Sequence, residues 1–219
     1  VPSYIGKGVA LSQSSQNFKA IECYDEALEI DPNNVDIYLN KGLALSRLVK
    51  EREAIECYEK AIKLDPLYLD GYHNKGNSLM KLKEFEEAVP LYNQAIQLDP
   101  TRASTHFDKG VALERLHKDQ QAIESFDVVI ALVPTSSAGY YNKGRVLQDV
   151  KRYKEAIACY DKAIELDPRS AEAYFLKGNS FFELGDYQLA ITCFDKAIER
   201  KPDFPKAREN KELALRKLD

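Results

Sequence analysis

The chain has 219 residues, of which 44% are hydrophobic, and it is long enough to bury a sizeable core. Its 31 Lys and Arg against 35 Asp and Glu give a net charge of −4, with both signs interspersed along the sequence, which argues against nucleic acid or an anionic membrane as the main partner. No apolar run approaches the roughly 20 residues that span a bilayer, and the start "VPSYIGKG" lacks the features of a signal peptide. We therefore expect a soluble, cytoplasmic protein with reduced cysteines.

Taken in chain order, one short phrase recurs at a fixed period. It reads "YLNKG" from Tyr38 and "YHNKG" from Tyr72, and its glycine falls at positions 8, 42, 76, 110, 144 and 178. Prolines at 32, 66, 100, 134, 168 and 202 share the same spacing of 34 residues. The sequence therefore divides into six units without insertion or deletion, namely 1–34, 35–68, 69–102, 103–136, 137–170 and 171–204.

Each unit predicts two helices. Apolar residues recur at unit positions 4, 8, 11 and 14 and again at 20, 21, 24, 27 and 28, which is helical spacing twice over. Helix A is expected over about positions 2–14 and helix B over about 18–30, ending before the proline because proline cannot continue a helix. We expect Pro90 to interrupt helix B of the third unit. The segment 205–219 continues the helix A pattern with Glu212 in place of the glycine, and it predicts a C-terminal capping helix.

This spacing resembles the tetratricopeptide repeat (TPR) family of 34-residue helix-turn-helix repeats. The fifth unit carries the family pattern as Tyr140, Gly144, Leu147, Ala156, Tyr160, Ala163 and Pro168. The resemblance implies an all-α fold, a right-handed superhelical solenoid of six repeats plus the capping helix. Because Gly costs about 1 kcal/mol relative to Ala in a helix, we expect Gly144 to permit close approach of helix B, opposite Ala156.

One departure from the family pattern is a lysine before each of these glycines, where the family usually has an apolar residue. The lysines are Lys7, Lys41, Lys75, Lys109, Lys143 and Lys177. We expect their stems to pack while the ammonium groups reach solvent, and the sequence does not identify their partners.

The residues that could carry chemistry do not form a reactive set. Cys23, Cys57, Cys159 and Cys193 all occupy unit position 23, so neighbouring copies should lie about 10 Å apart, too far for a disulfide. His106 replaces the core tyrosine and is expected to be a hydrogen-bonded core residue. No Ser/His/Asp set, phosphate-binding glycine loop or HExxH motif occurs. We therefore expect no catalysis, no cofactor and no metal.

Function is expected on the face of helix A that the core does not use, at unit positions 2, 5, 6, 9, 12 and 13. The resemblance implies that this face lines a concave groove that binds a peptide or another protein. Position 5 is apolar or aromatic in most units, and position 6 carries short polar side chains resembling the asparagine ladders of some TPR proteins. An Asn can pair with both the N–H and the C=O of one peptide residue. The candidate peptide-binding residues are Leu39, Asn40, His73, Asn74, Asn77, Phe107, Asp108, Tyr141, Asn142, Arg145, Phe175 and Asn179.

The hypothesis is therefore a protein-interaction scaffold that binds an extended peptide or partner segment in its groove, and several alternatives stay open. The asparagines could instead bond to the neighbouring repeat, and curvature could partly bury position 5. The array could also self-associate as a structural assembly. Finally, a chain that begins at Val1 and has its single Met at position 80 could be a processed product or the substrate-recruiting segment of a larger enzyme.

Overall fold

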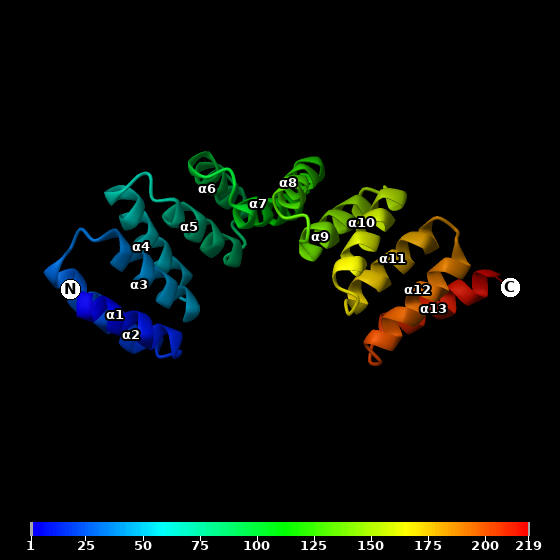
Figure 1. Ribbon diagram of the computed structural model, residues 1–219, viewed down its shortest axis with the longest axis horizontal. Coiled ribbons are helices and arrows are strands. Elements are labelled where there is room, and N and C mark those ends of the chain that lie inside the picture. The colour runs from blue at the N-terminus through cyan, green and yellow to red at the C-terminus, as the bar shows by residue number, and fades with distance from the viewer. Residues whose placement is uncertain (1, 219) are drawn as a thin grey trace. The chain divides into compact units, whose positions relative to one another are not determined.

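The computed structural model describes residues 2–218, with side chains from Tyr4 onward, and this part of the chain is all-α, as predicted. The helices at A positions are α1 (Pro2–Gln13), α3 (Val35–Arg47), α5 (Leu69–Lys81), α7 (Ala103–Arg115), α9 (Ser137–Asp149) and α11 (Ala171–Glu183). Those at B positions are α2 (Asn17–Ile30), α4 (Glu51–Leu64), α6 (Phe85–Leu98), α8 (Asp119–Leu132), α10 (Tyr153–Leu166) and α12 (Tyr187–Arg200). A last helix, α13, spans Pro205–Leu218 (Figure 1).

The helices form two compact units, the first ending at Ala112 and the second beginning at Leu113. In the first unit α1 packs on α2, α3 on α4 and α5 on α6, and in the second α9 packs on α10, α11 on α12 and α12 on α13 (Figure 1). Successive A-type helices also touch, α3 contacting α1 and α5 in one unit and α11 contacting α9 and α13 in the other. We call the surface formed by positions 2, 5, 6, 9, 12 and 13 of these helices the A-helix face. We propose that the six 34-residue segments are the structural repeats, because each holds one A helix and one B helix.

An aromatic residue from each B helix forms the centre of its repeat. These side chains are at most 1% exposed and are Tyr24, Tyr58, Tyr92, Phe126, Tyr160 and Phe194. In the fifth repeat the ring lies over the helix A glycine, since a Cβ added to Gly144 would be only 2.7 Å from Cε1 of Tyr160. The close approach is confirmed, but the expected partner was wrong: the nearest atoms belong to the Tyr160 ring and not to Ala156. The ring fills the space that a glycine side chain leaves open.

In every repeat, the turn between helices A and B contains one residue in the left-handed backbone conformation, always at the same unit position. Unit position 15 has a positive φ at Ser15, Val49, Lys83, His117, Lys151 and Gly185. The following N–H then bonds to a carbonyl five residues earlier, as from Lys50 to Leu45 at 3.0 Å, which closes the helix end. Only Gly185 adopts this conformation without steric cost. The turn could not be predicted from the sequence, because the other five residues at this position are not glycine.

In the second, third and fourth repeats, the side chain at position 4 joins the A helix to the proline that precedes it. The hydroxyls of Tyr38 and Tyr72 each donate to a proline carbonyl six residues earlier, at 3.2 Å. In the next repeat, Nε2 of His106 lies 3.0 Å from the carbonyl oxygen of Pro100 and makes the equivalent hydrogen bond. His106 is 9% exposed. The prediction that His106 is a hydrogen-bonded core residue is confirmed.

Pro90 does not interrupt α6, which runs from Phe85 to Leu98, so that prediction was wrong. Proline removes one backbone hydrogen bond from the helix. Pro90 lies on the exposed side of α6, whereas Ala88, Tyr92 and Ala95 on the opposite side of the helix are completely buried. Packing of these three residues therefore holds the helix together across the missing bond.

Four of the repeated lysines, and Lys211 at the equivalent position of α13, pair with an acid at position 25 of the preceding repeat. Nζ lies 2.5–2.7 Å from a carboxylate oxygen in each pair, and the lysine side chains are 20–33% exposed. The pairs are Lys41–Asp25, Lys75–Glu59, Lys143–Asp127, Lys177–Asp161 and Lys211–Asp195. The expected packing of the stem is confirmed, and the ammonium group links two repeats. The sequence signal was the recurring acid at position 25, which only the third repeat replaces, with Asn93.

All four cysteines are free thiols, as expected from their spacing. Cys23, Cys57 and Cys193 are buried and Cys159 is half-buried. Burial raises the pKa of Cys57 to about 11, and the nearby Lys41 opposes the rise. These side chains therefore act as small packing groups.

Candidate functional site

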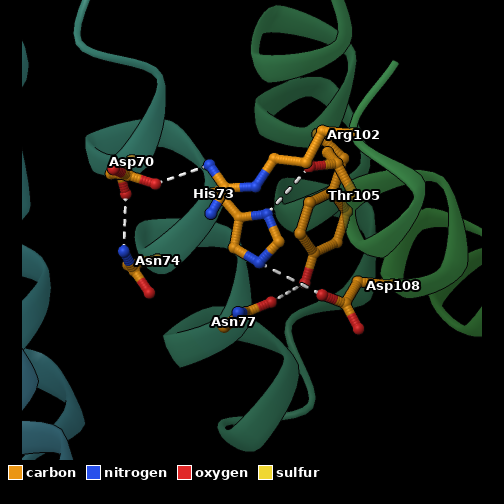
Figure 2. A network of polar contacts seen from close by, with 8 residues as sticks. Asp70, His73, Asn74, Asn77, Arg102, Thr105 and Asp108 are labelled. Carbon is orange, nitrogen blue, oxygen red and sulfur yellow. Dashed lines mark hydrogen bonds and ion pairs between the residues drawn. The ribbon is translucent and has the colours of Figure 1, made fainter. Parts of the chain in front are cut away.

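On the A-helix face of the first unit, His73 is the centre of a polar network between α5 and α7 (Figure 2). Its Nδ1 lies 2.9 Å from Oγ1 of Thr105, and its Nε2 lies 3.2 Å from Oδ2 of Asp108. The Tyr92 ring meets it edge-on, with ring centroids 6.0 Å apart. His73 was predicted as a peptide-binding residue, but its side chain is buried, with 6% of its surface exposed. It is therefore held inside the protein rather than presented to a ligand.

The contacts of His73 with a Thr on one side and an Asp on the other resemble those of a catalytic triad of nucleophile, base and acid. This set was not predicted from the sequence. Thr105 and Asp108 come from the repeat after His73, and neither stands in a recognisable motif with it. Thr105 is completely buried, so a substrate cannot reach its hydroxyl. The three residues connect two helices instead. Among the described residues, no group of three or more His, Cys, Asp and Glu is placed to hold a metal ion.

Two further contacts lie beside these three residues, one at Asp70 and one at Asn77 (Figure 2). Arg102 donates from Nη1 to Oδ1 of Asp70 at 2.5 Å. The Tyr92 hydroxyl donates to Oδ1 of Asn77 at 2.7 Å. Burial raises the pKa of Tyr92, with a smaller contribution from Asp108, so the phenol keeps the proton that it donates. One of the two lone pairs of the Asn77 oxygen is therefore occupied.

The position 6 asparagines bond to their own helices and not across to the neighbouring repeat. Each donates from Nδ2 to a backbone carbonyl four residues earlier, at 2.7 Å for Asn40, 2.8 Å for Asn74 and 2.9 Å for Asn142. Oδ1 of Asn142 also accepts from Arg145 at 3.2 Å. For Asn40 and Asn74, no other described residue bonds to the side-chain amide. Each of these two keeps one N–H and its oxygen free for a ligand.

Position 5 is half-buried along the face at Leu39, Phe107, Tyr141 and Phe175. Tyr141 packs near Tyr160 with ring centroids 6.3 Å apart. Phe175 lies between two rings, with centroids 5.9 Å from Phe194 and 4.9 Å from Phe204. These side chains therefore extend the core while leaving part of their surface on the A-helix face.

Arg145 is a half-buried charged residue on this face of the second unit. It forms an ion pair with Glu114, whose side chain is 10% exposed. Burial raises the pKa of Glu114, and Arg145 opposes that rise. A charged hollow of about 540 Å³ beside this pair is lined by Glu114, Arg115, His117, Asp119, Arg145 and Asp149.

The remaining candidate, Asn179, lies in a second pocket of about 310 Å³ in the same unit. This pocket is lined by Gln148, Asn179, Phe182, Glu183, Asn210 and Leu213. Of these six residues, only Asn179 was predicted from the sequence. The available signal was the presence of amides at neighbouring unit positions 6, 9 and 12, which meet only once three A-type helices are stacked.

Models of the tetratricopeptide repeat match residues 8–49, 35–68, 69–102 and 141–205, which together cover most of the chain. The chain belongs to the tetratricopeptide repeat family. It is accordingly a TPR protein-interaction scaffold. No curated protein sequence matches it significantly.

Solved TPR structures show the same fold. YrrB, described as a TPR protein with an unusual peptide-binding site, is 22% identical with a TM-score of 0.77, covering 88% of this chain and 99% of YrrB. PilF of Pseudomonas aeruginosa is 23% identical with a TM-score of 0.79, covering 95% of each chain. MamA is 26% identical with a TM-score of 0.73, covering 77% of this chain and 92% of MamA. Within the described part of this TPR chain, every helix is too short or too polar to cross a bilayer.

Proposed function

We propose that the A-helix face binds an extended peptide segment of a partner protein. The observation that carries this is the matched pair of amides at Asn40 and Asn74. They occupy equivalent positions on the adjacent helices α3 and α5, and the same bond to the helix backbone fixes each side chain. Each keeps one donor and one acceptor, which is what the backbone of an extended peptide requires.

The expected binding is weak unless side chains add to it. A hydrogen bond of this kind contributes about 1 kcal/mol net, so two amides support only sequence-tolerant binding. Because the amides are already held in place, less rotamer entropy is lost on binding. Leu39 and Phe107 in the first unit, and Tyr141 and Phe175 in the second, supply apolar contact surface. Asp108 would favour a basic residue at its end of the peptide.

The test begins with a random 12-residue peptide library displayed on phage and selected on the wild-type chain. Affinity of the selected peptides is then compared between wild type and the variant Asn40→Ala/Asn74→Ala. Loss of the amide bonds should weaken binding about 10- to 30-fold. Asn33→Ala, an exposed loop substitution of the same chemistry, is the matched control and should bind as wild type does.

Both variants should keep the wild-type melting temperature, because the substituted side chains are not part of the buried core. The double variant Asn74→Ala/Asn142→Ala extends the test to the second unit. Selected peptides that bind all variants with equal affinity would contradict the amide contacts. A melting temperature that falls together with affinity would assign the asparagines a structural role instead.

A further inference from the structure

The pocket of about 310 Å³ in the second unit has a hydrogen-bonding pattern that selects one kind of side chain. It lies where α11 contacts both α9 and α13, on the A-helix face. Three of its six lining residues carry a primary amide, one carries a carboxylate and two are apolar. The orientation of the amides decides which groups remain available in it.

Gln148 presents its nitrogen. Its Oε1 accepts a hydrogen bond from the Tyr160 hydroxyl at 2.9 Å, and the Ser180 hydroxyl shares its single proton between this oxygen, at 3.2 Å, and the Leu176 carbonyl, at 3.1 Å. The bond from Tyr160 sets the orientation of the Gln148 amide, with its oxygen toward Tyr160 and Ser180. Its Nε2 donates to no other described residue. Gln148 is therefore a hydrogen-bond donor toward the pocket.

Asn179 and Asn210 supply a further donor and an acceptor to the pocket. Nδ2 of Asn210 donates to Oδ1 of Asn179 at 2.7 Å. This leaves the whole Asn179 NH2 group as a second donor and the whole Asn210 oxygen as an acceptor, while the Asn179 oxygen keeps one lone pair and the Asn210 nitrogen keeps one N–H. The exposed carboxylate of Glu183 is a further acceptor. The pocket thus offers at least two donors, from α9 and α11, and at least two acceptors, from α11 and α13.

We propose that this pocket binds the side-chain amide of a glutamine in the partner peptide, an assignment that rests on the function proposed above. The glutamine oxygen accepts from Gln148 and Asn179, and its nitrogen donates to Asn210 and Glu183. Phe182 and Leu213 contact the two methylene groups of its stem.

Other side chains leave part of the pocket unsatisfied. A lysine or arginine satisfies the two acceptors but brings its positive charge against the two amide donors. An aspartate or glutamate satisfies the donors but is repelled by Glu183. A leucine leaves all four polar groups without a partner, which is the more costly kind of mismatch.

The test uses four pools of capped nine-residue peptides that are identical except for the central residue, which is Gln, Glu, Lys or Leu, with the flanking positions randomised. Each pool is passed over the immobilised 219-residue chain and the retained fraction is measured. We expect the Gln pool to be retained about tenfold more than each of the others. A wild-type preference for the Glu, Lys or Leu pool would overturn the assignment.

The variant Gln148→Glu sharpens the test because it keeps the oxygens that bind Tyr160 and Ser180 but replaces the pocket donor with an acceptor. Its preference should change from the Gln pool to the Lys pool. Gln97→Glu makes the same change of charge on the exposed side of α6 and should keep the wild-type preference. Equal retention of all four pools by the wild type would refute the binding of glutamine in this pocket but would leave the proposed peptide binding by the A-helix face intact. Retention of none would refute both.

Discussion

Gly42 offers the sharpest test of how helices A and B approach each other. A Cβ added there would lie 2.5 Å from Cε1 of Tyr58 and 2.9 Å from Cδ1 and Cζ of the same ring. The ring is 1% exposed, so it has no open space into which it can turn. Overpacking of this kind costs about 1–3 kcal/mol, whereas Ala is favoured over Gly in a helix by about 1 kcal/mol. We therefore expect Gly42→Ala to lower the free energy of unfolding by up to about 2 kcal/mol.

Gly6 is the matched control, because an added Cβ there meets nothing within 4 Å. Gly6→Ala should therefore raise the free energy of unfolding by up to about 1 kcal/mol. Both are measured by urea denaturation followed by far-ultraviolet circular dichroism. Shortening the facing ring in Gly42→Ala/Tyr58→Leu should cost less than the sum of the two single changes. If the two glycine substitutions stabilise the protein equally, the close-approach argument is refuted.

Three further predictions concern stability. Val49→Gly should raise the free energy of unfolding by about 1 kcal/mol, because a β-branched residue at a φ of 62° is strained; an unchanged urea midpoint would argue against that strain. Lys143→Met removes the pair with the half-exposed Asp127 and should cost less than about 1 kcal/mol, with a smaller loss in about 1 M salt; a loss that does not depend on salt would point to packing of the stem. Burial raises the pKa of Cys57 from 9.0 to about 11, so the folded chain keeps a proton that the unfolded chain releases in this window. The free energy of unfolding should therefore fall as the pH rises from about 9 to about 11, and Cys57→Ala should reduce that fall.

Much of the fold could be predicted because its signals are local. Helix A and helix B follow from apolar spacing within a unit, and in the fifth repeat the observed α9 and α10 each begin one residue earlier than expected. Pro90 shows the limit of such reasoning. Its helix-breaking tendency is a local property, but burial of Tyr92 and its neighbours in the same helix outweighed it.

The candidate site was predicted less completely, because its geometry depends on residues from different repeats. Helical periodicity was sufficient to put Asn40 and Asn74 on the A-helix face, but not to show that each bonds to its own backbone. His73 was expected on that face as well, and it is buried because Thr105 and Asp108 of the next repeat cover both of its nitrogens. Contacts of this kind between two repeats cannot be predicted from the residue spacing within either repeat.

By itself the sequence determined the period of 34 residues, the two helices of each unit and the face on which the polar side chains lie, since all three depend on spacing along one helix. Only the tertiary structure decided the left-handed turn at position 15, the pairing of lysines such as Lys143 with the preceding repeat and the orientation of the amides around Gln148. These features depend on which side chains meet when helices stack, and a hydrogen bond or an ion pair forms only where both partners are brought within reach.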